Sequence, residues 1–359
     1  MAGKAIHYYA CGNTAKGFIS LLDTNLTGLT QLYLLKDGLP SEKTALMKEI
    51  GADWQNRGLD IEYLHCSRDQ DALDGVIIPA LMAGILDGTP PHAINISRAE
   101  TMDCGCAEES GKCSQQLERI QALNWVIDTG LSAAYAAFAA ALRTHDDWEA
   151  IYISNMDVAA HSKVTQLLID RILADNVLDK PTVVRHRFMG GATPAGPVDY
   201  IPNLTQDITK RFFLKGRPGT GKSTLLKKLA AAAEIRGFDV ENYHCGFDPD
   251  SMDMVILREL GVAVIDTTAP HEYFPSRDSD EIIDLYQEII KPGTDEAYEA
   301  KLKEITRDYK LKIAEGTACL EKVKASKATL DGISSRALHP IAMKEAKEKI
   351  QRLMESVSS

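Results

Sequence analysis

The sequence predicts an α/β fold in two tandem copies, each with a mainly parallel sheet and an added helical hairpin. The chain repeats itself: shifted by 179 positions, residues 7–92 overlay 186–271 without a gap, and 27 of these 86 positions are identical. Short apolar runs alternate with longer helical ones, as in α/β proteins. The segment ADNVLDKP, at 174–181, is polar and ends in proline. We therefore predict two domains, at 1–180 and 181–359.

The elements of each copy follow in the same order. A strand (AIHYYA or VVRHRF) leads through a glycine-containing turn to a second strand (QLYLLK or RFFLKG). A helix comes next, and then strands at LDIEYLH or FDVENYH and at AGILD or VAVID. The segments 114–144 and 294–359 are helical and charged, with Glu and Lys three and four residues apart in the second. We expect them to form helical hairpins against or beside each sheet.

Length and charge limit the class of protein. With 359 residues the chain is long enough for two domains that each bury a core. The 40 Lys and Arg against 51 Asp and Glu give a net charge of -11, which disfavours binding to nucleic acid or to anionic membranes. The longest apolar run, LSAAYAAFAAAL, is too short to span a bilayer, and the N-terminus has no apolar core of signal-peptide length. Seven cysteines, an odd number, fit reduced thiols, so we expect a cytoplasmic protein.

The segment GRPGTGKS, at 216–223, matches the GxxxxGK[ST] pattern of a phosphate-binding loop (P-loop). It follows an apolar strand and precedes STLLKKLAAAAE, a strong helix former. Glycine at Gly216, Gly219 and Gly221 lets successive N–H groups point toward a phosphate at the start of the helix. Lys222 would reach the β- and γ-phosphates, and the Ser223 hydroxyl would ligate Mg²⁺. The alternative is a glycine-rich turn that only caps a helix.

Asp266, the last residue of the apolar run VAVID, is the candidate partner of Ser223 on the metal side. In P-loop proteins an Asp at the end of a strand commonly holds the magnesium ion. A strand-end Asp also commonly caps the turn that follows it, and this reading stays open.

The corresponding loop of the first copy, KDGLPSEKT, keeps Lys43 and Thr44 but loses the glycines. Asp37, Pro40 and Glu42 stand where the second copy has its three glycines. Proline removes an N–H donor, and the Glu42 carboxylate would repel a phosphate. We therefore predict that the first copy binds Mg-nucleotide weakly or not at all, with Lys43 paired to Glu42 or Asp37. It would serve either to shape the second site or bind a second substrate, or only to stabilise the second copy.

Two pairs of residues after the second loop are weaker candidates. Asp248 and Asp250, which follow the strand after the P-loop helix, are placed to orient an attacking hydroxyl or water. Asp in an Asp-Pro turn also makes local backbone hydrogen bonds. His271 and Glu272, a few residues beyond Asp266, would sense the γ-phosphate or position water, or serve as structural hydrogen-bonding groups.

Two further groups occur in one copy only. Arg185 and Arg187 precede the second loop, and the first copy lacks both, so they would supply charge near a phosphate or lie on the surface. The cysteines of MDCGCAEESGKC form a CxCx₆C cluster that would bind a soft metal if a fourth ligand such as His92 came near, or would lie in a solvated loop. These cysteines are Cys104, Cys106 and Cys113.

The repeated HC pair, the LDG or IDT turn and the tandem loops resemble a family of poorly characterised bacterial tandem P-loop ATPases, described as nucleotide-kinase-like. The resemblance covers nearly the whole chain and implies ATP binding in a tandem NTPase fold. In that family the first loop is also glycine-rich, and this chain departs from it there, which weakens the case for a two-site mechanism. The loop and the resemblance assign nucleotide contact to Gly216, Gly219, Thr220, Gly221, Lys222, Ser223 and Thr224.

Together these features predict Mg-dependent binding and hydrolysis of ATP at the second copy, with ATP and Mg²⁺ as cofactors. Lys222, Asp248, Asp250 and Asp266 are the predicted catalytic residues, and Ser223 and Asp266 the predicted metal ligands. Two alternatives stay open: a kinase for a small molecule such as a nucleoside or nucleotide, and a nucleotide-dependent switch that recruits a protein partner. An oligomer is possible.

Overall fold

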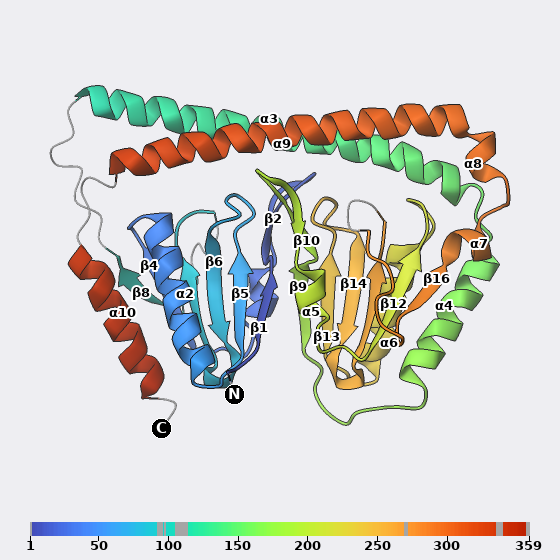
Figure 1. Ribbon diagram of the computed structural model, residues 1–359, viewed down its shortest axis with the longest axis horizontal. Coiled ribbons are helices and arrows are strands. Elements are labelled where there is room, and N and C mark those ends of the chain that lie inside the picture. Colours follow the sequence, from blue (N-terminus) through green and yellow to red (C-terminus); the bar gives the residue numbers. More distant parts are fainter. Residues whose placement is uncertain are drawn as a thin grey trace.

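A computed structural model describes residues 2–91, 96, 98–104, 114–268, 272–334 and 340–356. It contains two six-stranded sheets that stand side by side beneath a pair of long helices (Figure 1). We call each sheet with the helices that cover it a lobe; the first lobe holds the sheet of the first copy and the second lobe that of the second copy. The mixed α/β class predicted from the sequence is confirmed.

Both sheets have the same strand order. The first runs β1 (Ala5–Tyr8), β5 (Ile61–His65), β6 (Leu73–Ile78), β7 (Ala83–Asp87), β4 (Gln31–Lys36), β8 (Glu100–Asp103). The second runs β9 (Val184–Phe188), β13 (Val240–His244), β14 (Met252–Leu257), β15 (Val262–Asp266), β12 (Lys210–Lys215), β16 (Glu281–Asp284). In each sheet three of the five strand pairs are parallel, and β6 or β14 runs antiparallel to both its neighbours. The sheets are thus mostly parallel, as predicted.

Shorter elements repeat in the same way. Each glycine-containing turn is a hairpin, β2 (Cys11–Thr14) with β3 (Gly17–Ser20), or β10 (Gly190–Thr193) with β11 (Gly196–Asp199). The helix after the second strand is α2 (Pro40–Asn56) or α6 (Lys222–Ile235), and it lies on its own sheet (Figure 1). The remaining short helices are α1 (Leu22–Asn25), η1 (Pro79–Leu81), α5 (Ile201–Leu204), η2 (Arg258–Leu260), α7 (Leu285–Ile289) and α8 (Thr294–Ala297).

The two long helices pair with each other rather than within a copy. α3 (Ser114–Ile153) and α9 (Glu299–Ser334) run antiparallel across both sheets (Figure 1). Small residues permit a close approach: a Cβ at Gly130 would lie 2.7 Å from Val323, and one at Gly316 would lie 2.3 Å from the Phe138 ring. The predicted hairpin within each copy is therefore wrong, because the apolar face of each long helix is covered by its counterpart from the other copy.

The helices that follow the long pair are exchanged between the copies. α4 (Val158–Leu173) comes from the first half of the sequence, yet it packs on α6 in the second lobe. α10 (Pro340–Glu355) ends the second half and packs on α2 in the first lobe (Figure 1). The boundary near residue 180 therefore separates the two sequence repeats but not the two packed lobes.

Helix α3 also bears on the membrane prediction. The run LSAAYAAFAAAL is part of a much longer helix, of which Gln116–Ile153 is long and apolar enough to be a weak candidate membrane span by length and composition alone. The same helix packs along α9, and Leu131, Ala134 and Phe138 are buried with Leu320 and Val323 of that helix. A single helix of this kind in the described part of the chain is weak evidence for a membrane span, so a soluble protein is plausible.

The lobes share a core and a buried ion cluster. Tyr8 and Leu64 of the first sheet lie in one apolar cluster with Met189 and Phe213 of the second copy. At its edge the side chain of Arg187, on β9, is fully buried, and its guanidinium lies 2.8 Å from a carboxylate oxygen of Glu62 on β5. The chain therefore folds as two lobes held together by apolar packing and by a charge pair that crosses between them.

Candidate functional site

The Gly216–Ser223 loop joins the carboxyl end of β12 to the start of α6, which begins at Lys222. Gly219 and Gly221 have φ of +78° and +77°, a region that residues with a Cβ rarely adopt. Neither position has room for a side chain. A Cβ at Gly219 would lie 2.4 Å from the carbonyl oxygen of Glu149 on α3, and one at Gly221 would lie 2.4 Å from Nε2 of His161 on α4. Both glycines are therefore required by backbone angle and by the close approach of α3 and α4.

The structure places Lys222 and Asp266 beside each other. β12 and β15 are parallel neighbours, so Asp266 at the end of β15 lies beside Leu214, just before the loop. The Lys222 ammonium donates to the carbonyl oxygen of Arg217 at 2.8 Å and lies 3.7 Å from the Asp266 carboxylate. Asp266 also accepts from the backbone N–H of Thr268 at 2.8 Å, which is the turn-capping contact left open above. This turn contact uses one carboxylate oxygen, and the second oxygen faces Lys222.

Of the other loop residues, some are held by hydrogen bonds or close contacts within the loop, and Thr224 is exposed to solvent. Thr220 is buried, and its hydroxyl donates to the Arg217 carbonyl at 2.8 Å. Ser223 Oγ accepts from the backbone N–H of Met252 at 2.9 Å, which leaves one lone pair for another ligand. Thr224 is exposed on the first turn of α6. Gly216 is held close to Thr220, since a Cβ there would lie 2.4 Å from the threonine hydroxyl.

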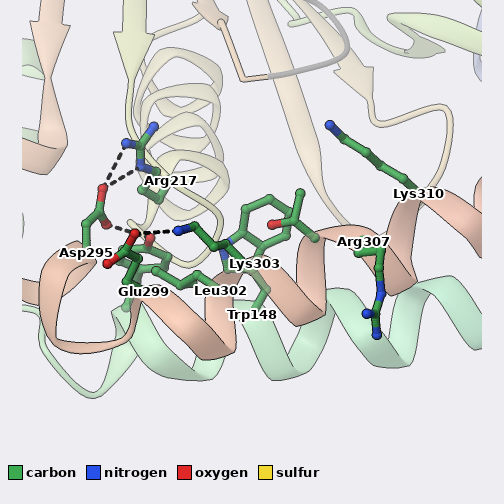
Figure 2. A pocket seen from close by; sticks show the side chains of 10 residues that line it. Trp148, Arg217, Asp295, Glu299, Leu302, Lys303, Arg307 and Lys310 are labelled. Carbon is green, nitrogen blue, oxygen red and sulfur yellow. Dashed lines mark hydrogen bonds and ion pairs between the residues drawn. The ribbon is translucent and has the colours of Figure 1, made fainter.

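A cavity of about 590 Å³ opens beside the loop (Figure 2). Trp148 and Tyr152 of α3 form part of its wall, and Arg217 of the loop lies at one end. Arg217 pairs with Asp295 at 2.8 Å, and the Tyr152 hydroxyl donates to the same carboxylate at 2.7 Å. Partial burial would raise the pKa of Asp295, but the hydrogen bonds from Tyr152 and Arg217 outweigh it and lower that pKa. The cavity also carries three cationic side chains of α9, Lys303, Arg307 and Lys310.

His161 is a loop contact that sequence reasoning missed. It is buried on α4, and its Nε2 lies 3.0 Å from the Gly221 carbonyl oxygen. It precedes the loop by about sixty residues and belongs to the other sequence copy, so no local pattern connects it with the glycines. The helix α4 thereby fixes the loop backbone directly before Lys222.

The corresponding region of the first lobe is built differently. α2 begins at Pro40, so positions that form the open loop in the second lobe are the first helical turn here. Lys43 is buried, with its ammonium 2.6 Å from Asp87, the counterpart of Asp266. The predicted pairing of Lys43 with Glu42 or Asp37 is therefore wrong. The shorter distance to the strand-end aspartate, 2.6 Å against 3.7 Å in the second lobe, leaves Lys43 less available to a ligand.

The loop that carries Asp248 and Asp250 lies against α6. Lys227 of α6 donates to the Asp250 carbonyl at 2.6 Å, and Met252 of the same segment donates to Ser223. Asp248 accepts from the Asp250 N–H at 3.3 Å, the local contact expected of an Asp-Pro turn. Burial, assisted by the charge of Asp250, raises the pKa of the Asp248 carboxyl. Asp250 is exposed, and its side chain pairs with Lys16 of the first copy.

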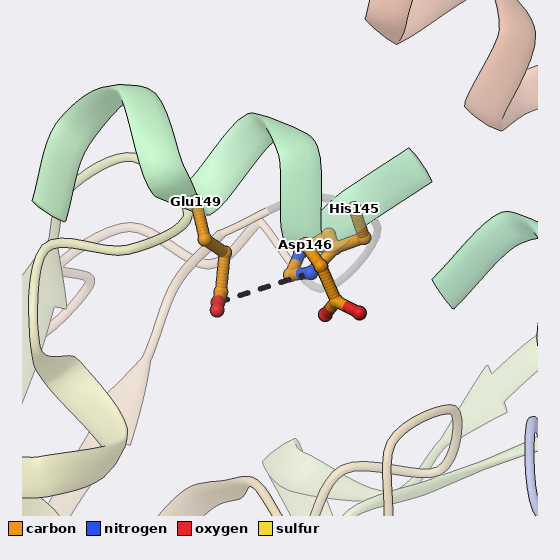
Figure 3. Close-up of side chains that lie close together, drawn as sticks. All are labelled: His145, Asp146 and Glu149. Carbon is orange, nitrogen blue, oxygen red and sulfur yellow. Dashed lines mark ion pairs between the residues drawn. The ribbon is translucent and has the colours of Figure 1, made fainter. Parts of the chain in front are cut away.

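A second acidic group faces the same region from α3. His145, Asp146 and Glu149 each offer one possible metal-ligand atom, and these three atoms lie within 4.8 Å of one another. Figure 3 shows the three side chains projecting from the same side of the helix, with His145 3.8 Å from Glu149. Because the Glu149 backbone contacts Gly219, these groups lie near the glycine loop. Sequence reasoning missed them, since a histidine and two acids at neighbouring positions of a charged helix are usually solvated.

The remaining sequence candidates are placed as follows. Arg187 is fully buried between the lobes, so neither the phosphate role nor the surface position predicted for it holds. Arg185 is half-buried and lines a small cavity that also contains Glu62. Glu272 is exposed, while His271 lies outside the described residues. Cys104 is buried, which raises the pKa of its thiol to about 11; Cys106, Cys113 and His92 lie outside the described residues.

Comparisons of the chain with protein-family models, with curated proteins and with solved structures found no match. The resemblance to tandem P-loop ATPases therefore stays a prediction that depends on the motifs.

Each lobe also contains a pair of hydrogen-bonded histidines where its first two parallel strands meet. His7 Nδ1 lies 2.9 Å from His65 Nε2, and His186 Nδ1 lies 2.8 Å from His244 Nε2. Burial lowers the pKa of all four, and that of His65 falls to about 3, with further lowering by His7 and Lys48. The folded chain therefore holds these imidazoles neutral under conditions in which an unfolded chain protonates them.

We expect the free energy of unfolding to fall as the pH drops below the ordinary histidine pKa of 6.5. In that range the unfolded state binds more protons, so each depressed histidine costs up to about 1.4 kcal/mol per pH unit until its folded pKa is reached. Acids with pKa values of about 2, such as Asp280 and Glu281, contribute only at lower pH. Urea unfolding at pH 7.0 and 5.5 measures the effect, and His65→Gln should reduce the difference. An equal stability at both pH values would contradict the expectation.

Proposed function

We propose that the second lobe binds Mg-ATP at the Gly216–Ser223 loop and hydrolyses it. The observation that carries the proposal is the loop itself. A glycine-rich turn with two residues at positive φ leads from the end of a central strand into a helix whose first residue is Lys222. The free N–H groups and positive end of such a helix favour a phosphate group. Lys222 rests on the loop's own carbonyl group, so its ammonium is already beside that position.

The cavity beside the loop supports a nucleotide rather than a free phosphate. It borders Arg217, and its wall includes Trp148, whose half-buried ring offers a stacking surface to a base. Its volume of about 590 Å³ is in the range of small-molecule sites. Lys310 of α9 adds positive charge on the same side, while Lys303 is paired with Glu299 of the same lining. A ligand with a planar base and several negative charges matches this lining.

The residues present fit a magnesium ion. Ser223 Oγ keeps a lone pair free, and one Asp266 oxygen is not used by the turn that follows β15. Hard oxygen donors of this type suit Mg²⁺, which usually keeps several waters and binds substrate phosphates. When bound, the ion would neutralise charge on the β- and γ-phosphates. Ser223 and Asp266 would hold it, while Lys222 and the loop N–H groups hold the phosphates.

A small-molecule kinase is the second candidate. Asp248 favours it, because its half-buried carboxyl has a raised pKa and lies on the loop that contacts α6. A carboxylate of this kind is suited to accept a proton from an acceptor hydroxyl. Hydrolysis requires no binding site for an acceptor molecule, since water is the acceptor.

The fate of the γ-phosphate tests both. With γ-labelled ATP and Mg²⁺, we expect free phosphate from the intact protein and a loss of about 100-fold or more in Lys222→Ala. Lys215→Ala is the matched control, because Lys215 ends β12 and pairs with Asp284 on the surface. Thermal unfolding of each variant separates loss of activity from loss of structure.

Label transferred to a metabolite from a cell extract would replace hydrolysis with a kinase reaction. Tight binding without turnover would indicate a nucleotide-dependent switch. Equal activity of Lys222→Ala and the intact protein would remove the loop from the reaction and contradict the proposal.

A further inference from the structure

The turn of the first-lobe hairpin reaches the second-lobe site. Ala15 and Lys16 connect β2 to β3, and the Ala15 N–H donates to the Phe247 carbonyl oxygen at 2.9 Å. Ala15 is buried in the apolar cluster under α3 and α9, which Phe247 also contacts. The turn of the first copy is therefore seated against the 246–251 segment, which carries Asp248 and Asp250.

Lys16 forms an ion pair with Asp250. The two side chains are 45% and 72% exposed. Ion pairs this exposed contribute little to stability, because water screens the charges and ordering two long side chains costs entropy. Stability therefore gives no sufficient reason for a lysine at the tip of this hairpin.

Asp250, the partner of Lys16, belongs to a segment that is hydrogen-bonded to the helix after the Gly216–Ser223 loop. Lys227 on α6 binds the Asp250 carbonyl, and two residues further on the Met252 N–H binds Ser223 Oγ. Ser223 directly follows Lys222. A shift of Asp250 would therefore act on the first two turns of α6, on which the predicted phosphate and metal contacts depend.

The contacts between this segment and its helix recur in the first lobe, where Lys48 donates to the Asp71 carbonyl at 3.3 Å and the Leu73 N–H donates to Thr44 Oγ1 at 3.1 Å. The hairpin lysine does not recur. The counterpart of Lys16 in the second hairpin is Ala195. Asp71, the counterpart of Asp250, pairs instead with Lys324 of α9 at 2.7 Å, and Lys324 also binds Asp69 at 2.8 Å. A hairpin lysine is thus directed at the lobe with the glycine loop and not at the lobe that lacks it.

We propose that Lys16 is a positioning residue for the reaction of the second lobe, supplied by the first. It holds the Asp250 carboxylate and, through the 246–251 segment, the start of α6. This role rests on the proposed function of the glycine loop. It also assigns a purpose to a first lobe whose own loop has lost its glycines.

The test compares Lys16→Ala and Lys16→Arg with Lys4→Ala. Lys4 is the matched control, because it forms another exposed ion pair between the two copies, 3.0 Å from Asp207. We expect Lys16→Ala to lower the kcat for ATP about tenfold, with KM for ATP and the melting temperature unchanged. Lys16→Arg should restore kcat, since a guanidinium also pairs with a carboxylate. Lys4→Ala should match the intact protein.

The outcomes separate this role from the function on which it rests. An unchanged kcat in Lys16→Ala, alongside a loss in Lys222→Ala, overturns the role of Lys16 and leaves the ATPase in place. A parallel fall of kcat and melting temperature that arginine does not rescue shows a structural residue and also overturns it. No turnover by the intact protein removes the proposed function and this role with it.

Discussion

Arg187→Met will lower the free energy of unfolding by about 3–5 kcal/mol. The Arg187 side chain is fully buried and donates to Glu62 and Asn25 at 2.8 and 2.9 Å, while its guanidinium lies 4.0 Å from the Tyr8 ring centre. Burial alone would lower its pKa, but Glu62 and other neighbours raise that pKa well above its ordinary value. Removing the cation leaves the Glu62 carboxylate, whose side chain is 15% exposed, without its compensating charge.

The loss of stability in Arg187→Met should arise from the buried carboxylate that loses its cation. Glu241 also lies near Arg187, at 3.6 Å, but it keeps Arg258 at 2.7 Å. Glu62 is therefore the carboxylate left without this cation, although the Tyr8 hydroxyl still donates to it at 2.6 Å. Adding Glu62→Gln to Arg187→Met should therefore recover part of the loss, because it removes the stranded charge. Arg171→Met is the control, since Arg171 forms an Arg–Glu pair, bidentate at 2.6 Å, that is exposed to solvent.

Urea unfolding of the three variants and the intact chain measures these differences. We expect Arg171→Met to cost less than about 1 kcal/mol. An Arg187→Met loss as small as this would mean that the lobes do not bury the cluster in solution. No recovery in the double variant would mean that the loss comes from packing on Tyr8 rather than from charge.

The sequence predicted the repeated strands well and missed those whose signal is ambiguous. β4, β5, β7 and their counterparts are short apolar runs next to turn residues, and they form where expected. β6 contains Asp74 and Gly75, so its sequence does not read as a central strand, yet the whole strand is buried. The neighbouring strands β5 and β7 pair with β6 on both sides, so it is the tertiary structure, not the local sequence, that places β6 inside the sheet.

The exchange of helices was beyond the sequence for a different reason. The apolar periodicity of α3 or α4 predicts that one face of the helix is buried, but it does not predict which element buries that face. The same pattern is satisfied by a hairpin within a copy or by the counterpart helix of the other copy. Contacts that depend on the exchange, such as His161 with Gly221 and Glu149 with Gly219, were therefore missed, whereas the local relation of Lys222 to Ser223 was not.

The exchange leads to the largest expected effect, the failure of the second half to fold alone. A fragment of residues 181–359 lacks α4, whose Leu168, Ile169, Ile172 and Leu173 are buried in the core of the second lobe. Burying an apolar side chain of this size contributes about 1.5–3 kcal/mol, so four of them approach the whole stability of an ordinary domain. The fragment also loses His161 and Glu149 from the glycine loop, so we expect neither cooperative unfolding nor ATP binding.

A fragment of residues 154–359 is the matched comparison, because it restores α4 and His161 but not α3. Circular dichroism during urea unfolding should show a cooperative transition for 154–359 and none for 181–359, and mixing 1–180 with 181–359 should restore a transition and ATP binding. If 181–359 alone unfolded cooperatively and bound ATP, α4 would be dispensable and the two halves would be independent domains. Since each half carries the helix that covers the other's sheet, mutual dependence is the physical consequence of the fold. It also explains how a first copy without a glycine loop remains necessary to the second.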